Sequence, residues 1–197
     1  MLTQARAAIV ATLFFTLLLG VAYPLAVTGI AHLAFPAQAG GSLIRNDKGE
    51  VIDSALIGQT FAKPQYIHSR PSAAGSNGYD ASASSGSNLG PLNPDLAKRI
   101  AKDTAALASE GQGPVPADAV TTSGSGLDPD VSPANALRQA ARVAQARGVA
   151  VSEVERAIAA NTTGPWLGVF GQPHVNVLKV NLALDANVPL RPAHPAG

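Results

Sequence analysis

The sequence predicts an α+β protein: a single N-terminal transmembrane helix followed by one extracytoplasmic domain of mixed helices and short strands. Three observations carry this prediction: a long uncharged apolar run near the N-terminus, about 160 residues after it, and strand and helix patterns that interleave there without a steady rhythm. That length suits one domain with a core. We expect residues 1–36 to form the tail and membrane helix, residues 37–186 the soluble domain, and residues 187–197 a loose proline-rich tail.

The apolar run covers residues 7–35, and no Asp, Glu, Lys or Arg lies between Arg6 and Arg45. It holds fourteen Leu, Ile, Val and Phe residues, which together favour membrane insertion by roughly 4–8 kcal/mol. At about 1.5 Å per residue the run would reach about 43 Å, more than a hydrocarbon core of about 30 Å. The run therefore predicts a retained, tilted membrane anchor.

Two other interpretations of the run stay open. The segment Ala37-Gln38-Ala39 before Gly40 resembles the cleavage site of a signal peptide, although a signal peptide's apolar region is usually about half as long as this run. The run could also be a buried core helix, which fits poorly in so small a domain. The two sides of the run carry equal numbers of flanking positive charges, so the positive-inside rule does not decide its orientation. A short tail carrying only Arg6 favours a cytoplasmic N-terminus, and hence an exported domain.

Pro24 lies in the middle of the run and removes one backbone hydrogen bond, so we expect a kink between Gly20 and Pro24. In lipid such a defect needs cover from a neighbouring helix or a local rearrangement. With the weakly polar Thr12, Thr16 and Thr28, it hints at packing against other membrane helices. Threonine and proline are also ordinary in single spans.

Beyond the anchor, the pattern predicts short extended segments. Residues 42–52 are typical of two strands around a turn at residues 46–49, and residues 55–61 and 66–68 are further candidates. Residues 69–94 are rich in Ser, Gly, Asn and Ala, a composition that also suits a flexible linker. Their tyrosine and irregularly spaced prolines favour an ordered, turn-rich surface.

The sequence Asn93-Pro94-Asp95 is typical of a helix start. One face of this helix is expected to carry Leu96, Ile100, Thr104 and Leu107, and residues 111–116 should end it. Residues 120–122 are a short extended candidate.

A second helix is expected to start at Ser132-Pro133 and to end at Gly148. Its predicted buried face consists of Leu137, Ala140, Ala141 and Ala144. A capping box at residues 152–155 predicts a third helix to about residue 161. Residues 175–184 alternate, with Leu178, Val180, Leu182 and Leu184 on one face, and so predict the clearest strand of the chain.

The residues offer little catalytic chemistry. The chain has no cysteine, which excludes thiol nucleophiles and thiolate metal sites. Its four histidines are scattered and form no H-E-x-x-H pair, and no G-x-S-x-G elbow occurs. A net charge of +1 without a basic stripe argues against a nucleic-acid partner.

Three polar features allow two interpretations each. The Gly-rich turn at residues 124–126 could cradle an anion, or be an ordinary turn. Asp128 and Asp130 could share a cation, or stabilise the N-terminus of the following helix. Arg138 and Arg142, one turn apart, could be a solvated face, or a docking contact for an acidic partner.

Several segments together resemble one family, the C subunit of the bacterial Kdp potassium-transporting P-type ATPase. The resemblance covers the anchor and nearly all of the domain up to residue 185. It is carried by RPSAAG from Arg70, SSGSNLGPLNP from Ser84, TTSGSGLDPDVSP from Thr121, QAARVAQARG from Gln139 and NVLKVNLALD from Asn176.

The resemblance implies a non-catalytic accessory subunit of a potassium uptake complex in the bacterial inner membrane. Its partners would be a channel-like potassium-binding subunit, a P-type ATPase subunit, a small single-span subunit, and membrane lipid. The chain lacks the D-K-T-G-T phosphorylation motif, which fits this role. The domain would stabilise the assembly outside the membrane and cover the potassium entrance, and it would need no cofactor of its own.

An alternative function also follows from the resemblance. The family's C subunit has been thought to raise the affinity of the ATPase subunit for ATP, with the glutamine of the Q-x-x-R-V-A run, Gln139, in contact with the nucleotide. An exported domain cannot reach cytoplasmic ATP, so we expect the assembly role. Candidate partner contacts lie in residues 69–94 and 121–133 and on the second helix: Arg70, Tyr79, Asn88, Ser123, Asp128, Asp130, Arg138 and Arg142.

Overall fold

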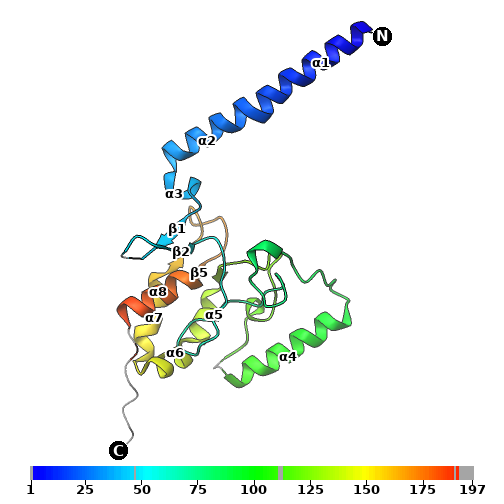
Figure 1. The fold of residues 1–197 in the computed structure, drawn as a ribbon. Helices are drawn as coiled ribbons and strands as arrows, with labels where there is room; N and C mark the ends of the chain where they lie inside the picture. Colours follow the sequence, from blue (N-terminus) through cyan, green and yellow to red (C-terminus); the bar gives the residue numbers. More distant parts are fainter. Residues whose placement is uncertain (1, 47, 111–112, 189, 191–197) are drawn as a thin grey trace, which may run out of the picture. The chain divides into compact units, whose positions relative to one another are not determined.

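The structure is a computed structural model that describes residues 2–46, 48–110, 113–188 and 190 (Figure 1). Its contacts divide the chain into two compact units, Met1–Ser54 and Ala55–Gly197. The first holds the long helix and a hairpin, and the second holds the mixed domain.

The first unit opens with a long helix in three consecutive parts: α1 (Leu2–Leu17), the π-helical segment η1 (Leu18–Ala22) and α2 (Tyr23–Ala34). Over Gln4–Ala34 this helix is long and apolar enough to cross a membrane. Its large apolar side chains are exposed, as expected of a helix whose partner is lipid.

The helix changes its hydrogen bonding just before Pro24. In η1 the amide of Tyr23 donates to the carbonyl of Leu18, one residue farther back than in an α-helix, and Pro24 lies in the first turn of α2. π-helical turns are rare and mark places where the regular hydrogen-bond ladder of a helix is interrupted. The kink expected between Gly20 and Pro24 stays a prediction; the structure shows a π-helical segment at this place.

After α3 (Pro36–Ala39), strands β1 (Leu43–Arg45) and β2 (Val51–Ser54) pair antiparallel. The side chain of Asn46 organises the connection, because its Oδ1 accepts hydrogen bonds from the amides of Lys48 and Glu50. The two predicted strands are confirmed; residue 47 of the predicted turn lies outside the described residues.

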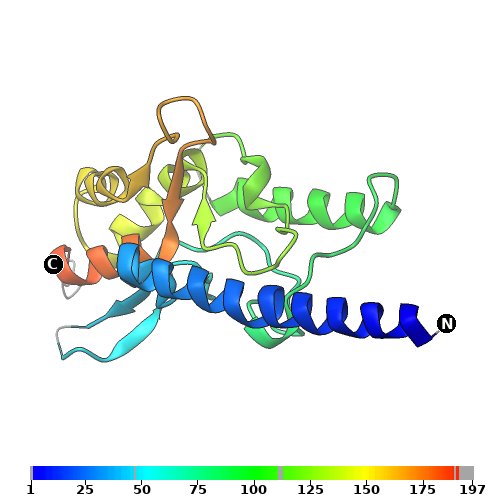
Figure 2. The same ribbon diagram turned by 90° about the horizontal axis from the view of Figure 1, so that it is seen from above.

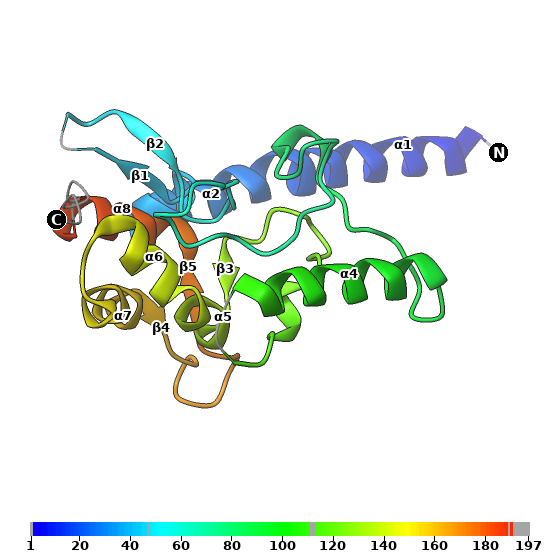
Figure 3. The same ribbon diagram turned by 90° about the horizontal axis from the view of Figure 1, so that it is seen from below.

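The second unit is built on a small antiparallel sheet in the order β3 (Asp130–Val131), β5 (His174–Asn176), β4 (Thr162–Thr163). Helices α5 (Pro133–Arg138), α6 (Ala140–Arg147), α7 (Val151–Ala160) and α8 (Val177–Asn187) pack with it. Helix α4 (Pro94–Glu110) has one end beside α5 and extends away from the other helices (Figure 3). Short 3₁₀ turns, η2 (Ala81–Ala83) and η3 (Ala117–Ala119), complete the unit. The mixed helix and strand content agrees with the predicted class.

The core of this unit consists of small aliphatic side chains from both halves of the domain. It comprises Ile67, Val131, Ala136, Ala140, Val143, Ala144, Val154, Ile158, Val175, Val177, Val180, Leu184 and Val188. Alanine on α5 and α6 lets neighbouring elements approach closely, which compensates for the scarcity of aromatic residues in the chain. Val188 belongs to this core, so the predicted loose tail does not begin at residue 187; residues 189 and 191–197 lie outside the described part.

The strand predicted at residues 175–184 is wrong beyond its first residues. Only His174–Asn176 forms β5, and α8 follows directly, with the Asn176 side chain accepting a hydrogen bond from the amide of Lys179 as its N-cap. Residues 177, 178, 180, 181 and 184 are buried, which is a helical spacing. The alternation misled because it counted Asn181 as an outward polar residue.

The helix starts at Pro94 and Pro133 and the helix end at Gly148 are confirmed. Ser132 caps α5 by accepting from the amide of Asn135, and Gly148 adopts the left-handed conformation with φ 67°. The third helix is present as α7. Its N-cap is Ala150, which makes no side-chain hydrogen bond to the start of this helix, so the predicted capping box is wrong. The stop expected at residues 111–116 falls partly outside the described residues.

The predicted second helix is interrupted at Gln139, and its predicted buried face is confirmed at Ala140 and Ala144 but not at the other two positions. Leu137 and Ala141 are exposed, whereas Asn135, Ala136 and Gln139 are buried. The polar side chains of Asn135 and Gln139 point inward, and the spacing of apolar residues alone does not indicate this. The extended candidates at residues 55–61, 66–68 and 120–122 run as irregular chain and turns.

Candidate functional site

The two segments expected to form a surface, residues 69–94 and 121–133, are folded against each other. The amide of Ser85 donates to the carbonyl of Ser125 at 2.9 Å, and the Ser72 hydroxyl donates to the carbonyl of Gly126 at 2.6 Å. A Cβ at Gly126 would lie 2.6 Å from the Ser85 oxygen and 2.7 Å from the Ala74 nitrogen, so no larger residue fits there. The expectation of an ordered, turn-rich region is confirmed.

Arg70 connects these two segments. Its guanidinium forms an ion pair with Asp128 at 2.8 Å and donates to the backbone oxygen of Thr121 at 3.1 Å. Tyr79, held at φ 56°, donates its hydroxyl proton to the carbonyl of Arg70 at 2.7 Å. Burial raises the pKa of this hydroxyl, which keeps it protonated as the donor. Arg70, Tyr79 and Asp128 therefore act together as an internal brace.

The two aspartates proposed to share a cation face different partners. Asp128 binds Arg70, whereas Asp130 accepts from the Asn176 side chain at 3.1 Å and lies 3.7 Å from the ring of His174. Burial raises the pKa of Asp130, and the charge of His174 opposes the rise. The described residues contain no group of three or more His, Cys, Asp or Glu side chains that could hold a metal ion.

Asp118, which the sequence analysis did not single out, serves the helix start instead. Its carboxylate accepts hydrogen bonds from the backbone amide and the hydroxyl of Ser132 at 2.8 and 2.9 Å, and from the Asn135 side chain at 3.1 Å. A carboxylate beside the start of a helix is stabilising. No local pattern indicated it, because the two partners are fourteen or more residues away in the chain.

The Gly-rich turn uses its own amides. The amide of Gly126 donates to the Ser123 hydroxyl at 2.8 Å, and that of Leu127 to the Ser125 hydroxyl at 3.1 Å. An anion cradle needs free amides, so the ordinary turn is the better interpretation. Asn88 is exposed and left-handed, with φ 53°, at the surface of the neighbouring segment.

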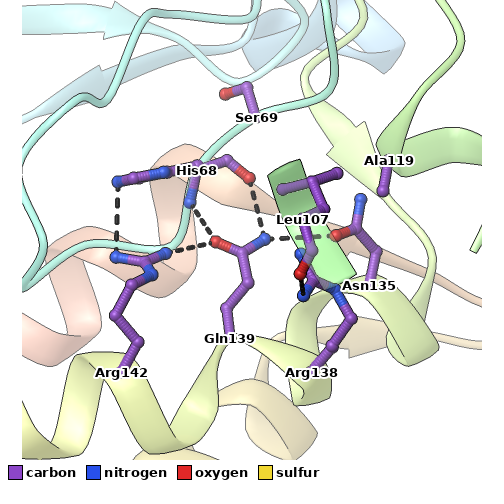
Figure 4. Close-up of a pocket in the computed structure, with 8 residues that line it drawn as sticks. All are labelled: His68, Ser69, Leu107, Ala119, Asn135, Arg138, Gln139 and Arg142. Atoms are coloured by element: carbon purple, nitrogen blue, oxygen red, sulfur yellow. Dashed lines mark hydrogen bonds between the residues drawn. The ribbon is translucent and has the colours of Figure 1, made fainter. Parts of the chain in front are cut away.

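Gln139 lies at the bottom of a small pocket between α5, α6 and the chain at His68 and Ser69 (Figure 4). Its oxygen accepts from the amide of His68 at 2.8 Å and from Arg142 at 2.6 Å. Its nitrogen donates to the carbonyl of His68 and to the Asn135 side chain, both at 3.2 Å. The amide therefore uses both donors and both acceptor positions within the chain.

The pocket itself has a volume of about 50 Å³. A water molecule occupies about 30 Å³, whereas pockets for small molecules usually measure about 300–1,000 Å³. The space above Gln139 therefore suits one or two waters. A nucleotide would need the pocket to open and the hydrogen bonds of Gln139 to break.

Arg138 and Arg142 line the same pocket and are half-buried. Arg138 donates to the carbonyl of Leu107 on α4 at 2.9 Å, and Arg142 donates to the carbonyl of Pro64 at 2.6 Å. Both arginines thus bind backbone oxygens of distant segments. This is neither the solvated face nor the free docking contact that the sequence left open.

Residues 64–68, next to this pocket, are held largely by side chains, although the amide of Tyr66 also donates to the backbone oxygen of Lys63 at 3.1 Å. Asn181 on α8 accepts from the amide of Ile67 at 2.8 Å and donates to its carbonyl at 2.9 Å, as Gln139 does for His68. Arg142 binds the carbonyl of Pro64, and Arg147 that of Gln65 at 2.8 Å. These side chains satisfy backbone groups of an irregular segment that pairs with no strand.

Arg147 is the most deeply placed of these side chains, with an exposed fraction of 0%. It also donates to the carbonyls of Leu184 and Val188 at 3.1 and 2.9 Å, pairs with Asp185 at 2.7 Å, and lies over the ring of Tyr66. Neither Arg147 nor Asn181 was predicted from the sequence. Their only signal was a polar residue at a helical position otherwise suited to the core.

The part of the chain that the structure describes has one helix able to span a membrane, and a domain whose polar clusters serve its own packing. A family model described as "K+-transporting ATPase, c chain" (KdpC) matches residues 5–186. The chain belongs to the KdpC family.

Curated relatives agree over nearly the full length. The potassium-transporting ATPase KdpC subunit of Caulobacter sp. (strain K31) is 62% identical over 190 residues, which cover 96% of each chain. That of Beijerinckia indica is 58% identical over 199 residues, covering 99% of this chain and 100% of the relative. That of Sorangium cellulosum is 53% identical over 188 residues, covering 94% and 98%.

Proposed function

We propose that this chain is a non-catalytic accessory subunit of an ATP-driven potassium uptake complex. In this proposal it stabilises the assembly of the channel-like potassium-binding subunit, the P-type ATPase subunit and the small single-span subunit. Membership of the KdpC family supports a place in the complex. The internal use of the polar clusters, above all the four hydrogen bonds of Gln139, supports a role through surface contact.

We place the N-terminus in the cytoplasm and the domain outside the bacterial inner membrane, where it could cover the potassium entrance. The helix at Gln4–Ala34 supports a single crossing, and the short tail with Arg6 supports this direction. Trypsin added to spheroplasts tests the placement. We expect cleavage of the domain without lysis; protection until the membrane is opened would contradict it.

The assembly role is tested by removing the domain while keeping the first unit. A chain that ends after Ser54 retains the spanning helix and the hairpin. We expect the complex that contains it to dissociate on purification, or to lose potassium-stimulated ATP hydrolysis. Full stimulated activity without the domain would defeat the proposal. The segments 69–94 and 121–133 stay candidates for the polar part of the contact, since their outer residues, such as Asn88, are exposed.

The alternative is that the domain raises the ATP affinity of the complex through Gln139. The pocket of about 50 Å³ and the four hydrogen bonds of Gln139 speak against it. Calorimetric titration of ATP into the full-length chain tests it directly. Saturable binding that Gln139→Ala abolishes would favour the alternative, and we expect none.

A further inference from the structure

The connection between β4 and β5 ends in an apolar tip that projects from the domain, in the orange part of the ribbon (Figure 2). Four large apolar side chains gather there within five residues: Trp166, Leu167, Val169 and Phe170, with exposed fractions of 70, 72, 74 and 60%. Single exposed apolar residues are ordinary, but a cluster at the tip of a projecting loop marks an interaction site. We call residues 165–170 the apolar tip.

The tip has a defined conformation. Trp166 and Phe170 form an antiparallel bridge, with backbone hydrogen bonds of 2.8 and 3.0 Å in the two directions, and their rings lie 5.7 Å apart. Turns from Pro165 to Gly168 and from Trp166 to Val169 close the end. A preformed arrangement loses little conformational entropy on binding, so its contact area converts more efficiently into affinity.

Leu167 at the end of the tip is in a left-handed conformation, with φ 52°. Leucine rarely adopts this conformation, whereas glycine and asparagine do so at little cost. An exposed leucine there gives no benefit to the packing of the domain. Strain retained at an exposed position indicates that the side chain has a use outside the fold.

The charge distribution indicates what the tip contacts. No Asp, Glu, Lys or Arg occurs between Arg156 and Lys179. Elements that bind the surface of a membrane usually add basic residues that attract anionic lipid headgroups, and this stretch offers none. An uncharged, preformed tip with a tryptophan instead suits an uncharged apolar pocket on a protein, because aromatic anchors of this kind dominate protein interfaces.

From these observations we propose that the apolar tip inserts into an apolar pocket on the extramembrane surface of a transport subunit, as the anchor of the larger contact. This inference rests on the proposed function. Four side chains cover only part of the roughly 800 Å² per partner that a stable interface buries. The remaining contact must therefore come from other surfaces of the domain.

The test uses the full-length tagged chain co-expressed with the other subunits of the ATPase. In the double variant Trp166→Ala/Phe170→Ala, we expect the amount of the other subunits retained on purification to fall at least about tenfold. Leu56→Ala, at a leucine that is 62% exposed and lies outside segments 69–94 and 121–133, is the matched control and should retain them fully. Leu167→Asn, which suits the left-handed backbone, should also lower retention without disturbing the turn.

Lipid as the occupant is tested separately, because Trp166 is the only tryptophan of the chain. The full-length chain alone is placed in phosphatidylcholine vesicles with brominated acyl chains, which quench only an indole inside the bilayer. We expect unquenched emission typical of an exposed indole; strong quenching would overturn the proposal in favour of membrane insertion. Full retention by both tip variants would overturn it too, while failure of the wild-type chain to retain any subunit would contradict the proposed function itself.

Discussion

Two segments of the domain depart from the usual arrangement of apolar side chains inside and polar side chains outside. One is surrounded by buried polar side chains, and the other exposes apolar ones. Residues 64–68 are held by the inward-facing polar side chains of Arg142, Arg147 and Asn181 together with Gln139, whereas residues 165–170 present large apolar side chains to solvent. In the first segment polar side chains stabilise the fold. In the second, the apolar side chains are exposed and contribute little to the core. The difference separates residues that maintain the domain from residues available to a partner.

The same difference explains why the polar residues first suspected of contacting partners are poor candidates for it. Arg70, Asp128, Arg138 and Arg142 all bind groups of their own domain. Substituting them would damage the fold and its partner surfaces together. A variant at these positions that loses the complex would therefore say little about direct contact.

The largest effect is expected at Arg147. Arg147→Met keeps most of the side-chain length but removes the guanidinium donor from the carbonyls of Gln65 and Val188 and one of the two donors from the carbonyl of Leu184. We expect the free energy of unfolding to fall by about 3–5 kcal/mol. Urea denaturation of the full-length chain in detergent, followed by circular dichroism, measures it. Arg156→Met, at an exposed arginine, is the control. An equal loss of unfolding free energy at both positions would contradict the stabilising role of Arg147.

Asn181→Leu should have the next largest effect. It removes the partners of both the amide and the carbonyl of Ile67 at a buried position. We expect a loss of roughly 2–4 kcal/mol, since each buried unsatisfied group costs about 1–3 kcal/mol. The exposed Asn187 supplies the matched change, Asn187→Leu, which should alter the midpoint of the urea transition little.

A substitution in the apolar tip is expected to raise the stability of the domain instead of lowering it. Leu167→Asn relieves the left-handed strain, so we expect the domain to gain about 0.5–1 kcal/mol of stability. The same variant should hold the other subunits less well. Unfolding and co-purification measured on one preparation would reveal this trade of stability against function; a destabilised Leu167→Asn protein would mean that the leucine side chain supports the fold.

The smallest effect on stability is expected from Trp166→Ala/Phe170→Ala. Both side chains are mostly exposed, and their mutual contact is a single ring pair. The free energy of unfolding should change by less than about 1 kcal/mol. A loss of several kcal/mol in the same urea titration would show that the tip belongs to the core, and the contrast between the two segments would fail.

Local signals predicted the parts of the fold that local chemistry decides. The Asn46 turn between two short strands, the prolines that open α4 and α5, and the glycine that ends α6 all act within a few residues. The strand predicted at residues 175–184 failed because Leu178, Val180 and Leu184, which share one face of the alternation, are also buried in the helix. Only the inward role of Asn181 distinguishes the two, and that role depends on Ile67, 114 residues away.

The candidate site was less predictable for the same reason. Gln139 was singled out by resemblance, and its partner His68 lies 71 residues away. Arg147 carried only the weak signal of a polar residue at a helical position suited to the core, and Asp118 carried none, because a charged residue on a helix or turn is ordinarily solvated. The apolar tip was visible in the sequence as the run WLGVF, but nothing in the residues alone distinguished an exposed tip from a buried strand.

The most direct test of the central claim is the dependence of potassium-stimulated ATP hydrolysis on ATP concentration in purified complexes carrying wild-type chain or Gln139→Ala. If Gln139 braces the domain, the variant should lower the yield or thermal stability of the complex, while the KM for ATP of the complex that remains intact stays unchanged. A raised KM in a complex of normal yield and stability would contradict this account and assign Gln139 to nucleotide binding.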